Sequence, residues 1–353
     1  MERLSVNQYI DDLKCIAESA IPWDGISGKT ILVSGATGMI GACLIDVLMY
    51  MNSRKGLNAR IIALGRSRRK AIARLPYFED KSFKFVETDI AAREISIDMK
   101  ADYVLHLASS THPKQYVSDP VGTVTGNVDG LRNLLDYSVG CGARLLFASS
   151  VEVYGENRGD VERFDESYCG YIDCNTLRAC YNESKRLGEA LCQAYRAQRG
   201  VETVIARIAR TYGPTMLSED SKALSQFIDS AIRGRNVVLK SRGVQKFSYL
   251  YVADVVAGIL TVLLCGTDGE AYNLSDERSD IMLKDLAHLV AIVGGVSVER
   301  EDPSAVEAAG YSRATVALMD ANKVRRLGWS AKFPIKRGIQ QTITILNKIY
   351  NKS

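Results

Sequence analysis

Short apolar runs alternate with longer amphipathic stretches up to about residue 208. Short runs rich in β-branched residues predict strands, and apolar positions that recur every three or four residues predict helices. We therefore expect strands at 29–34, 60–64, 83–88, 103–108, 143–149 and 203–208. The helices between them are expected at 39–50, 121–139 and 176–198. This alternation is typical of βαβ units, so the sequence predicts an α/β fold with a parallel, doubly wound sheet.

The two ends of the chain show different patterns. Ile10, Leu13 and Ala17 form a helical stripe that ends before Pro22, which predicts a cap helix on the outside of the main domain. Beyond residue 208, helices are expected at 222–233, 252–264, 282–293 and 336–349, with short apolar runs between them. We predict three parts: a cap helix (1–27), the main domain (28–208) and a smaller α/β lobe (209–353) whose segments interleave with the main domain.

Composition and charge narrow the class of ligand. The chain has 353 residues, of which 46% are hydrophobic and 24% charged, enough to bury a sizeable core. Lys and Arg number 45 against 41 Asp and Glu, a balance that predicts neither nucleic-acid nor membrane binding. No uncharged stretch offers the roughly 18 apolar residues of a membrane span, and the first 25 positions are too charged for a signal peptide. We expect a cytoplasmic protein with a small-molecule partner.

The inventory of metal ligands is small. Eight cysteines include no C-x-x-C pair, and the chain has only three histidines. We therefore predict no metal site, and we interpret the cysteines as reduced, mostly buried thiols.

Three glycines at three-residue spacing follow the first predicted strand. They are Gly35, Gly38 and Gly41, in the segment Gly-Ala-Thr-Gly-Met-Ile-Gly that opens a predicted helix. A turn of this kind directs backbone N–H groups and the helix N-terminus at a pyrophosphate. A turn that serves only packing would also use glycine. Here the strand before the glycines and the helix after them favour dinucleotide binding. The main domain is therefore predicted to be an NAD(P)-binding domain.

The end of the second strand bears on the form of the nicotinamide cofactor. An acidic residue there would hydrogen-bond the ribose diol of NAD, whereas an arginine can hold the 2′-phosphate of NADP. The chain has Arg66 at this point, followed by Ser67, Arg68 and Arg69, which favours NADP. Alternatively, these arginines are only the solvated start of a helix. Asp89, after the third strand, is placed to contact the adenine.

A serine, a tyrosine and a lysine form the candidate catalytic group. Ser150 follows the fifth predicted strand, at the edge where open α/β sheets bind ligands. Tyr181 and Lys185 are four residues apart on a predicted helix, so they share one face. A neighbouring cation lowers the pKa of a phenol, so we expect Lys185 to make Tyr181 a usable base. The group could then remove a proton from an alcohol while a nicotinamide takes the hydride.

With these motifs, the chain resembles the extended short-chain dehydrogenase/reductase family, and more narrowly its UDP-glucuronate decarboxylase branch, over about residues 28–265. Besides the glycine turn and the tyrosine–lysine pair, the resemblance rests on short motifs spread along the chain. They are His106-Leu-Ala108, Tyr116 with Ser118-Asp-Pro120, 143–150, Glu152-Val-Tyr-Gly155, Arg178-Ala-Cys-Tyr181, Lys185-Arg with Gly188-Glu-Ala190, Ala206-Arg-Ile208, Thr211-Tyr-Gly-Pro214, and Tyr251-Val with Asp254. Leu327-Gly-Trp329, before the last helix, is also similar to the family.

The resemblance implies a Rossmann domain with a C-terminal substrate lobe, and it assigns roles to residues. Tyr181 would be the base, Lys185 its partner, Ser150 a donor to the reacting oxygen and Glu152 an acid beside the sugar. Substrate contacts would come from Ser150, Glu152 and Arg210. The implied cofactor contacts are Gly35, Thr37, Gly38, Met39, Ile40, Gly41, Arg66, Asp89, Ile90, Leu107, Ala108, Ser109, Tyr181, Lys185 and Ile208. The family resemblance favours NAD as the cofactor, whereas Arg66 favours NADP.

The implied reaction is oxidation of a nucleotide sugar at C4 by bound NAD(P), followed by return of the same hydride. The resulting ketone would acidify the neighbouring position or complete a β-keto acid that loses CO2. The family resemblance also implies a homodimer paired through the helices near 121–139 and 176–198.

Three family contacts to the substrate are replaced together in this chain. An arginine that contacts the diphosphate is matched by Phe247, an asparagine by Arg210, and an arginine after Pro214 by Thr215. An uncharged ring cannot replace a guanidinium fork. Either Arg210, with Arg242 or Lys246, supplies the lost charge from another direction, or the pocket takes another polyol or sugar derivative whose carboxylate or phosphate binds Arg210.

Several reactions remain open at this point. Val151 stands where the dehydratase branch has an acidic proton donor, which disfavours dehydration. The sequence does not distinguish between 4-epimerase activity and decarboxylase activity. An NADP-dependent reductase or dehydrogenase of a keto-sugar or polyol would suit Arg66, and a cofactor-sensing protein without turnover is a further alternative that the intact Ser150, Tyr181 and Lys185 disfavour.

Overall fold

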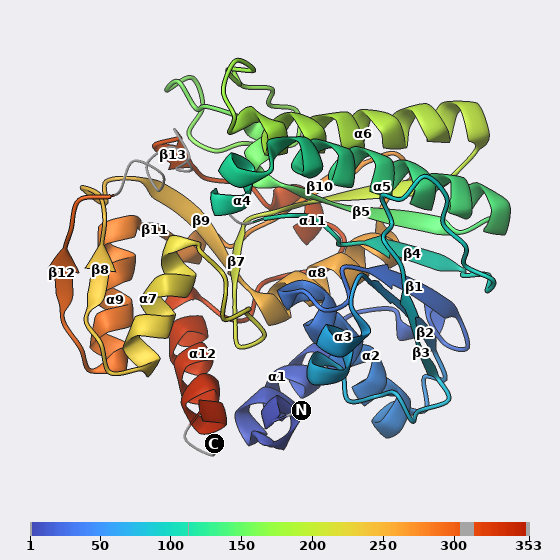
Figure 1. Cartoon of the computed structure of the whole chain (residues 1–353), viewed down its shortest axis with the longest axis horizontal. Helices are drawn as coiled ribbons and strands as arrows, with labels where there is room; N and C mark the ends of the chain where they lie inside the picture. The colour runs from blue at the N-terminus through green and yellow to red at the C-terminus, as the bar shows by residue number, and fades with distance from the viewer. Residues whose placement is uncertain (1, 112, 304–313, 351–353) are drawn as a thin grey trace.

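Seven parallel strands form the central sheet of the protein (Figure 1). The structure is a computed structural model that describes residues 2–111, 113–303 and 314–350. The strands are β1 (Thr30–Ser34), β2 (Arg60–Gly65), β3 (Phe83–Glu87), β4 (Tyr103–His106), β5 (Arg144–Ser150), β6 (Thr203–Ile208) and β10 (Ala271–Leu274). Their order is β10-β6-β5-β4-β1-β2-β3, so the direction of winding reverses between β1 and β4. Sheets of this type bind ligands beside that reversal, at the carboxyl ends of the strands.

Helices cover both faces of this sheet (Figure 1). α5 (Pro120–Cys141) and α6 (Ala179–Arg199) pack on one face, and α2 (Met39–Lys55) and α8 (Val252–Cys265) on the other. The apolar run in β1 is explained by burial on both faces of the sheet. Ile31 and Val33 belong to the core under α2, and Leu32 belongs to the core under α5. The predicted Rossmann fold is therefore confirmed. α8 and β10 follow residue 208 in the chain yet pack with this sheet.

The second lobe is built around β9 (Lys246–Tyr251). This strand pairs in parallel with β7 (Arg210–Tyr212) and β13 (Val316–Ala317), and antiparallel with β11 (Asp280–Met282). A separate parallel pair is formed by β8 (Val237–Leu239) and β12 (Val298–Arg300). The lobe's helices are α7 (Ala223–Ile232), α9 (Leu283–Gly294), α11 (Asn322–Arg325) and α12 (Ile335–Tyr350), and α7 packs against α9. Its short strands were not predicted, and neither was α4 (Pro113–Ser118) in the first domain, whereas α3 (Arg68–Arg74) matches the alternative that the arginines after β2 start a helix.

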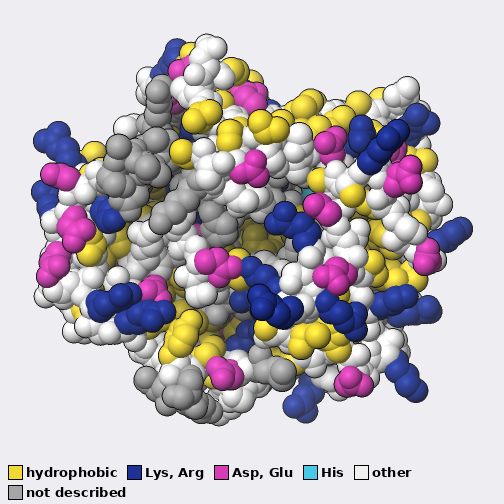
Figure 2. All heavy atoms as spheres, in the orientation of Figure 1, with side chains coloured by type: hydrophobic (Ala, Val, Ile, Leu, Met, Phe, Trp, Pro, Cys, Tyr) yellow, Lys and Arg dark blue, Asp and Glu magenta, His cyan; other side chains and the backbone are white. Residues whose placement is uncertain are grey.

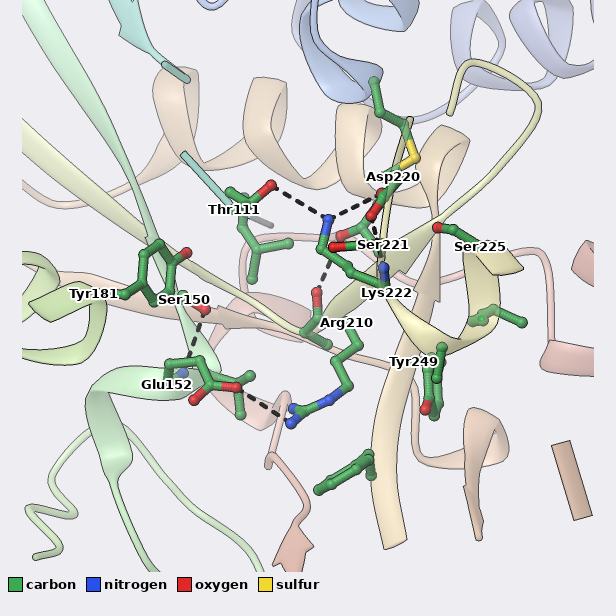
Figure 3. A pocket seen from close by; sticks show the side chains of 18 of the residues that line it. Thr111, Ser150, Glu152, Tyr181, Arg210, Asp220, Ser221, Lys222, Ser225 and Tyr249 are labelled. Atoms are coloured by element: carbon green, nitrogen blue, oxygen red, sulfur yellow. Dashed lines mark hydrogen bonds and ion pairs between the residues drawn. The ribbon is translucent and has the colours of Figure 1, made fainter. Parts of the chain in front are cut away.

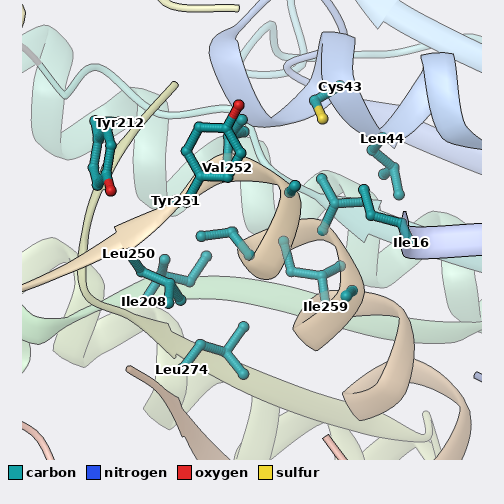
Figure 4. Close-up of a cluster of buried hydrophobic side chains, with 14 of the residues drawn as sticks. Ile16, Cys43, Leu44, Ile208, Tyr212, Leu250, Tyr251, Val252, Ile259 and Leu274 are labelled. Carbon is teal, nitrogen blue, oxygen red and sulfur yellow. The ribbon is translucent and has the colours of Figure 1, made fainter. Parts of the chain in front are cut away.

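The two lobes share one hydrophobic core, part of which is drawn in Figure 4. Ile16 of the N-terminal helix, Leu44 of α2 and Ile259 of α8 meet there with Ile208 of β6 and Leu250 of β9. This packing against the first domain holds β9 in place. β9 also lines the site described below. Within the described ranges, no helix combines the length and apolar character that a membrane crossing requires.

The N-terminal segment is anchored by a buried carboxylate. α1 (Asn7–Ala17) packs on α2, α8 and α12, and a short 3-10 helix at 2–5 precedes it. Arg3 donates to both carboxylate oxygens of Asp46, at 2.6 and 2.9 Å. The hydroxyls of Tyr9 and Tyr77 donate to the same carboxylate at 2.5 and 2.9 Å. Asp46 is fully buried on α2, so its charge depends on these partners.

We expect Asp46→Asn to destabilise the fold by about 3 kcal/mol, because it leaves the buried guanidinium of Arg3 without its carboxylate. Lys14→Ala is the matched control: Lys14 forms an exposed pair with Glu18 at 3.9 Å, and its loss should change the free energy of unfolding by less than about 1 kcal/mol. Urea unfolding measures both. Equal midpoints for Asp46→Asn and the parent chain would contradict the role given to this pair.

Candidate active site

A cavity of about 400 Å³ lies between the carboxyl edge of the main sheet and the second lobe. Four strand ends of the main sheet contribute to its wall: Gly35 follows β1, Leu107 follows β4, Ser150 ends β5 and Ile208 ends β6. From the second lobe come residues of β7, β9 and the start of α7, among them Arg210, Phe247 and Tyr249. The cavity therefore joins the predicted cofactor half and the predicted substrate half of the site.

The glycine turn fits the pyrophosphate of a dinucleotide. Gly35 has φ +70°, and a Cβ there would lie 2.7 Å from the backbone nitrogen of Ala108, so the turn packs directly against the chain after β4. A Cβ on Gly41 would collide with the carbonyl oxygen of Gly35. The 17-residue α2 begins at Met39 with no side-chain cap and no acidic residue in its first turn. Its first N–H groups and its dipole are thus available to an anion at the cavity wall.

A buried hydrogen bond joins the ends of β1 and β4 beside this turn. Ser34 Oγ lies 2.8 Å from His106 Nδ1, and the backbone N–H of Ala108 donates to Ser34 Oγ at 3.3 Å. Burial, together with the charge of Lys185, lowers the pKa of His106 to about 3. The ring is therefore neutral at pH 7 and can accept the serine hydroxyl proton. This contact fixes the two strand ends that carry Gly35 and Leu107.

The predicted cofactor contacts divide into two groups. Gly35, Gly38, Met39, Ile40, Gly41, Leu107, Ser109, Tyr181, Lys185 and Ile208 line the cavity. Thr37, Arg66, Asp89, Ile90 and Ala108 lie outside the lining. Arg66 is exposed at the end of β2, Asp89 accepts from the N–H of Ala91 at 3.0 Å, and Ile90 is the side chain closest to Gly130 of α5. Binding of a cofactor by these residues stays a prediction, as does the preference for NADP.

Tyr181 and Lys185 both project from α6 into the cavity, but their electrostatics differ from the prediction. The ammonium of Lys185 donates to the carbonyl of Ala148 at 2.8 Å and lies 5.9 Å from the centroid of the Tyr181 ring. Burial raises the pKa of Tyr181 to about 12, opposed by a hydrogen bond with Ser150 and by nearby arginines. The expectation that Lys185 lowers this pKa is wrong here, because burial of the phenol dominates and Lys185 does not contribute to the shift.

Lys185 is itself buried in apolar surroundings. Its ammonium lies 4.8 Å from the centroid of the Phe147 ring, and burial lowers its pKa to about 7. A buried ammonium with this pKa loses its proton near neutral pH. Lys185 can therefore exchange a proton within the cavity, a property that the sequence did not indicate.

Glu152 is held between two arginines. Figure 3 shows its ion pair with Arg210. Arg178 lies 3.1 Å from one carboxylate oxygen and Arg210 lies 3.2 Å from the other. Burial alone would raise the pKa of Glu152, but the two guanidiniums and a hydrogen bond from Asn182 hold it below its ordinary value. Glu152 therefore stays ionised at neutral pH, and the three side chains together carry a formal charge of +1.

Each arginine rests on an aromatic ring. Arg210 lies 3.6 Å from the centroid of Phe247, its neighbour on β9, and Arg178 lies 4.6 Å from the centroid of Tyr116. The Tyr116 ring stacks on Tyr181 at 5.0 Å. Phe247 thus supports the guanidinium of Arg210 from the strand where the family has an arginine. The sequence indicated Arg210, whereas it did not single out the contacts of Arg178 and Tyr116. The spacing of Arg178 and Tyr181, one helical turn apart, was the available signal.

The fold and the cavity define a dinucleotide-binding α/β protein, and comparisons with known proteins place it more closely. Residues 31–275 match the model of the NAD dependent epimerase/dehydratase family. The chain is 30% identical to UDP-glucuronic acid decarboxylase 1 of Xenopus tropicalis over 327 residues, which cover 91% of this chain and 72% of that protein. It is 32% identical to UDP-glucuronic acid decarboxylase 5 of Arabidopsis thaliana, over 89% of this chain and 88% of that one.

Solved structures share the fold at lower identity. UDP-glucose 4-epimerase of Thermotoga maritima superposes with a TM-score of 0.77 at 22% identity, over 90% of this chain and 99% of that one. UDP-glucuronic acid 4-epimerase of Bacillus cereus, in complex with UDP-glucuronic acid and NAD, superposes with a TM-score of 0.76 at 20% identity, over 91% and 100%. The chain belongs to the NAD-dependent epimerase/dehydratase family.

We expect Lys185→Met to stabilise the fold most strongly at and below pH 7 in protein freed of cofactor. The pKa of Lys185 is about 7 when folded and near 10.4 when unfolded, so between these values the unfolded chain binds more protons. Stability of the parent therefore rises with pH across this window, and the advantage of the variant shrinks. Urea unfolding of both proteins at pH 6 to 10 measures the difference, and a constant difference would contradict the depressed pKa.

Proposed function

We propose that the chain is an NAD(P)-dependent enzyme that modifies a nucleotide sugar through transient oxidation at C4, with decarboxylation of a sugar acid as its reaction. One observation carries the proposal: Ser150, Tyr181 and Lys185 line the same cavity as the glycine turn at the start of α2. The names of the relatives at 30 to 32% identity, which are UDP-glucuronic acid decarboxylases, support the substrate class.

Tyr181 and Ser150 would act on one oxygen of the sugar. A bound nicotinamide would supply the redox chemistry by taking the C4 hydride and returning it. The Tyr181 phenolate accepts the proton of the C4 hydroxyl, and the Ser150 hydroxyl donates a hydrogen bond to the same oxygen. Arg178 and Arg210 lower the pKa that burial raises in Tyr181, so they favour the ionised phenol. In the reverse direction Tyr181 returns the proton to the C4 oxygen.

The ketone at C4 allows the carboxylate of a sugar acid to leave. The C5–C6 bond breaks, CO2 departs, and the electron pair moves through C5 to the C4 oxygen. Ser150 and the protonated Tyr181 stabilise the negative charge on that oxygen by hydrogen bonds. A proton from water at C5, return of the hydride to C4 and return of the Tyr181 proton to the C4 oxygen would then give the decarboxylated sugar.

The arginine cluster supports an acidic substrate. Arg178, Arg210 and Glu152 line the cavity with Tyr181 and carry a net positive charge. A substrate carboxylate beside two partly buried guanidiniums gains more binding free energy than a neutral hydroxymethyl group would. In this proposal Glu152 holds the two arginines in place, rather than acting on the sugar as the family resemblance implies.

A 4-epimerase is the second candidate, because it needs the same Ser150, Tyr181 and Lys185. It is favoured by the solved structures of nucleotide-sugar epimerases that share this fold. The dehydratase reaction is disfavoured by Val151, a buried apolar side chain beside Glu152 in the cavity wall. An NADP-dependent reductase is supported only by the exposed arginine at the end of β2, Arg66.

Product analysis separates these reactions. The enzyme is incubated with UDP-glucuronate, UDP-galacturonate or UDP-glucose, each with NAD or NADP, and products are analysed by mass spectrometry and NMR. We expect a uronate to lose CO2 without net consumption of cofactor. A change of C4 configuration with the mass unchanged would instead support the epimerase, and net consumption of added NADPH by a keto-sugar would support the reductase.

In the same assay, Tyr181→Phe should lower turnover by about 10³-fold while cofactor affinity stays within about tenfold. Tyr171→Phe, at an exposed tyrosine, is the matched control and should leave turnover unchanged. Turnover by Tyr181→Phe at the parental rate would refute the assigned base.

We also propose that the chain forms a homodimer through α5 and α6. Apolar side chains gather along the upper edge of the molecule, over these helices (Figure 2). The exposed apolar side chains of these helices include Val121, Val124 and Val139 of α5 and Leu187 of α6. We expect sedimentation velocity to show a dimer, and Val121→Lys with Leu187→Lys to yield a folded monomer. A monomeric parent at micromolar concentration would contradict this proposal.

A further inference from the structure

The segment 213–222, which links β7 to α7, connects the second lobe to three parts of the first domain. It contacts α3, the first residue of α2 and the chain that follows β4. Those parts surround the glycine turn. We refer to residues 213–222 as the strap; in Figure 1 it is the yellow-green segment that passes beside α3.

The inner part of the strap is anchored at a buried threonine. Thr215 is 2% exposed, and its hydroxyl donates to the carbonyl of Met39 at 2.9 Å. Arg74 of α3 donates to the carbonyl of Thr215 at 2.6 Å. Met39 belongs to the glycine turn itself, so the strap is tied to the backbone that would face the pyrophosphate. Because Thr215 is shielded from water, its hydrogen bonds are costly to leave unmade.

The outer part of the strap lines the cavity. Lys222 lies 3.3 Å from Thr111 Oγ1 and 3.1 Å from Asp220 Oδ2 (Figure 3). Lys70 of α3 pairs with Glu219 at 2.7 Å, but both side chains are well exposed, so this pair contributes little. Thr215, which contacts Met39 and Arg74, is therefore a buried attachment of the strap.

The strap and the glycine turn line the same cavity. Leu217, Asp220, Ser221 and Lys222 contribute to the wall that also contains Gly38 and Met39. A dinucleotide whose pyrophosphate rests on the first turn of α2 would lie between that turn and the strap.

We propose that the strap is the outer wall of the dinucleotide site and retains the cofactor through turnover, with Thr215 and Arg74 as its positioning residues. The inference rests on the proposed function, since an enzyme that reduces and reoxidises the same nicotinamide needs slow cofactor dissociation. Release of the dinucleotide then requires the strap to detach from Met39 and α3.

The test measures cofactor dissociation without any sugar. NADH or NADPH, whichever binds more tightly, is loaded on the enzyme and displaced with excess oxidised cofactor, and the nicotinamide fluorescence is followed by stopped flow. Thr215→Val keeps the shape and removes the donor, and we expect dissociation to become about tenfold faster. Thr215→Ser restores the hydroxyl, and Glu219→Gln removes the exposed pair, so both should stay within about twofold of the parent.

A merely structural role for Thr215 makes a different prediction. It would lower the melting temperature of the cofactor-free protein and leave the dissociation rate unchanged, and this result would overturn the proposal. Arg74→Gln provides a second comparison if Thr215→Val does not fold. Absence of any NADH or NADPH binding would refute the dinucleotide site and the strap together. Retention controlled by the strap, with no turnover of any sugar, would refute the proposed reaction alone.

Discussion

The carboxyl ends of β1, β4, β5 and β6 meet at one edge of a parallel sheet, and each strand delivers a residue to the cavity there. This geometry depends on the close approach of β1 and β4, where Gly35 packs against the backbone of Ala108 and Ser34 bonds His106. A side chain on Gly35 would separate the two strand ends. The conformation of the glycine turn, and the positions of Ser150 and Ile208 across the sheet, follow from this packing.

Burial then sets the charges inside the cavity. The same exclusion of water that lowers the pKa of Lys185 raises that of Tyr181, whereas Glu152 remains ionised because two guanidiniums face it. In the proposed reaction, Arg178 and Arg210 would therefore matter as well as the helical pair, because both lower the pKa that burial raises in Tyr181. The cluster would also link the charge of the substrate to the ionisation of the base.

The sequence predicted the first domain well, because its strands are continuous apolar runs and its helices have clear stripes; 203–208 was predicted and observed with the same bounds. The second lobe was less predictable, since β7 and β13 have two or three residues and form only through non-local pairing with β9. The motif predicted that Tyr181 and Lys185 share one helix face. It did not predict their pKa values, because these depend on burial by segments that are distant in the sequence. The ring beneath Arg210, and the anchoring of Thr215, likewise arise only from tertiary packing.

The proposed function depends on one physical claim, that Tyr181 and a nicotinamide held on the glycine turn act on the same secondary alcohol of the sugar. Absorbance at 340 nm, recorded by stopped flow after cofactor-loaded enzyme is mixed with a nucleotide sugar acid, tests it most directly. We predict a rise that stays below one reduced nicotinamide per site and returns to the baseline as product forms. Product formation without any such transient, or a stoichiometric rise that persists, would contradict the claim.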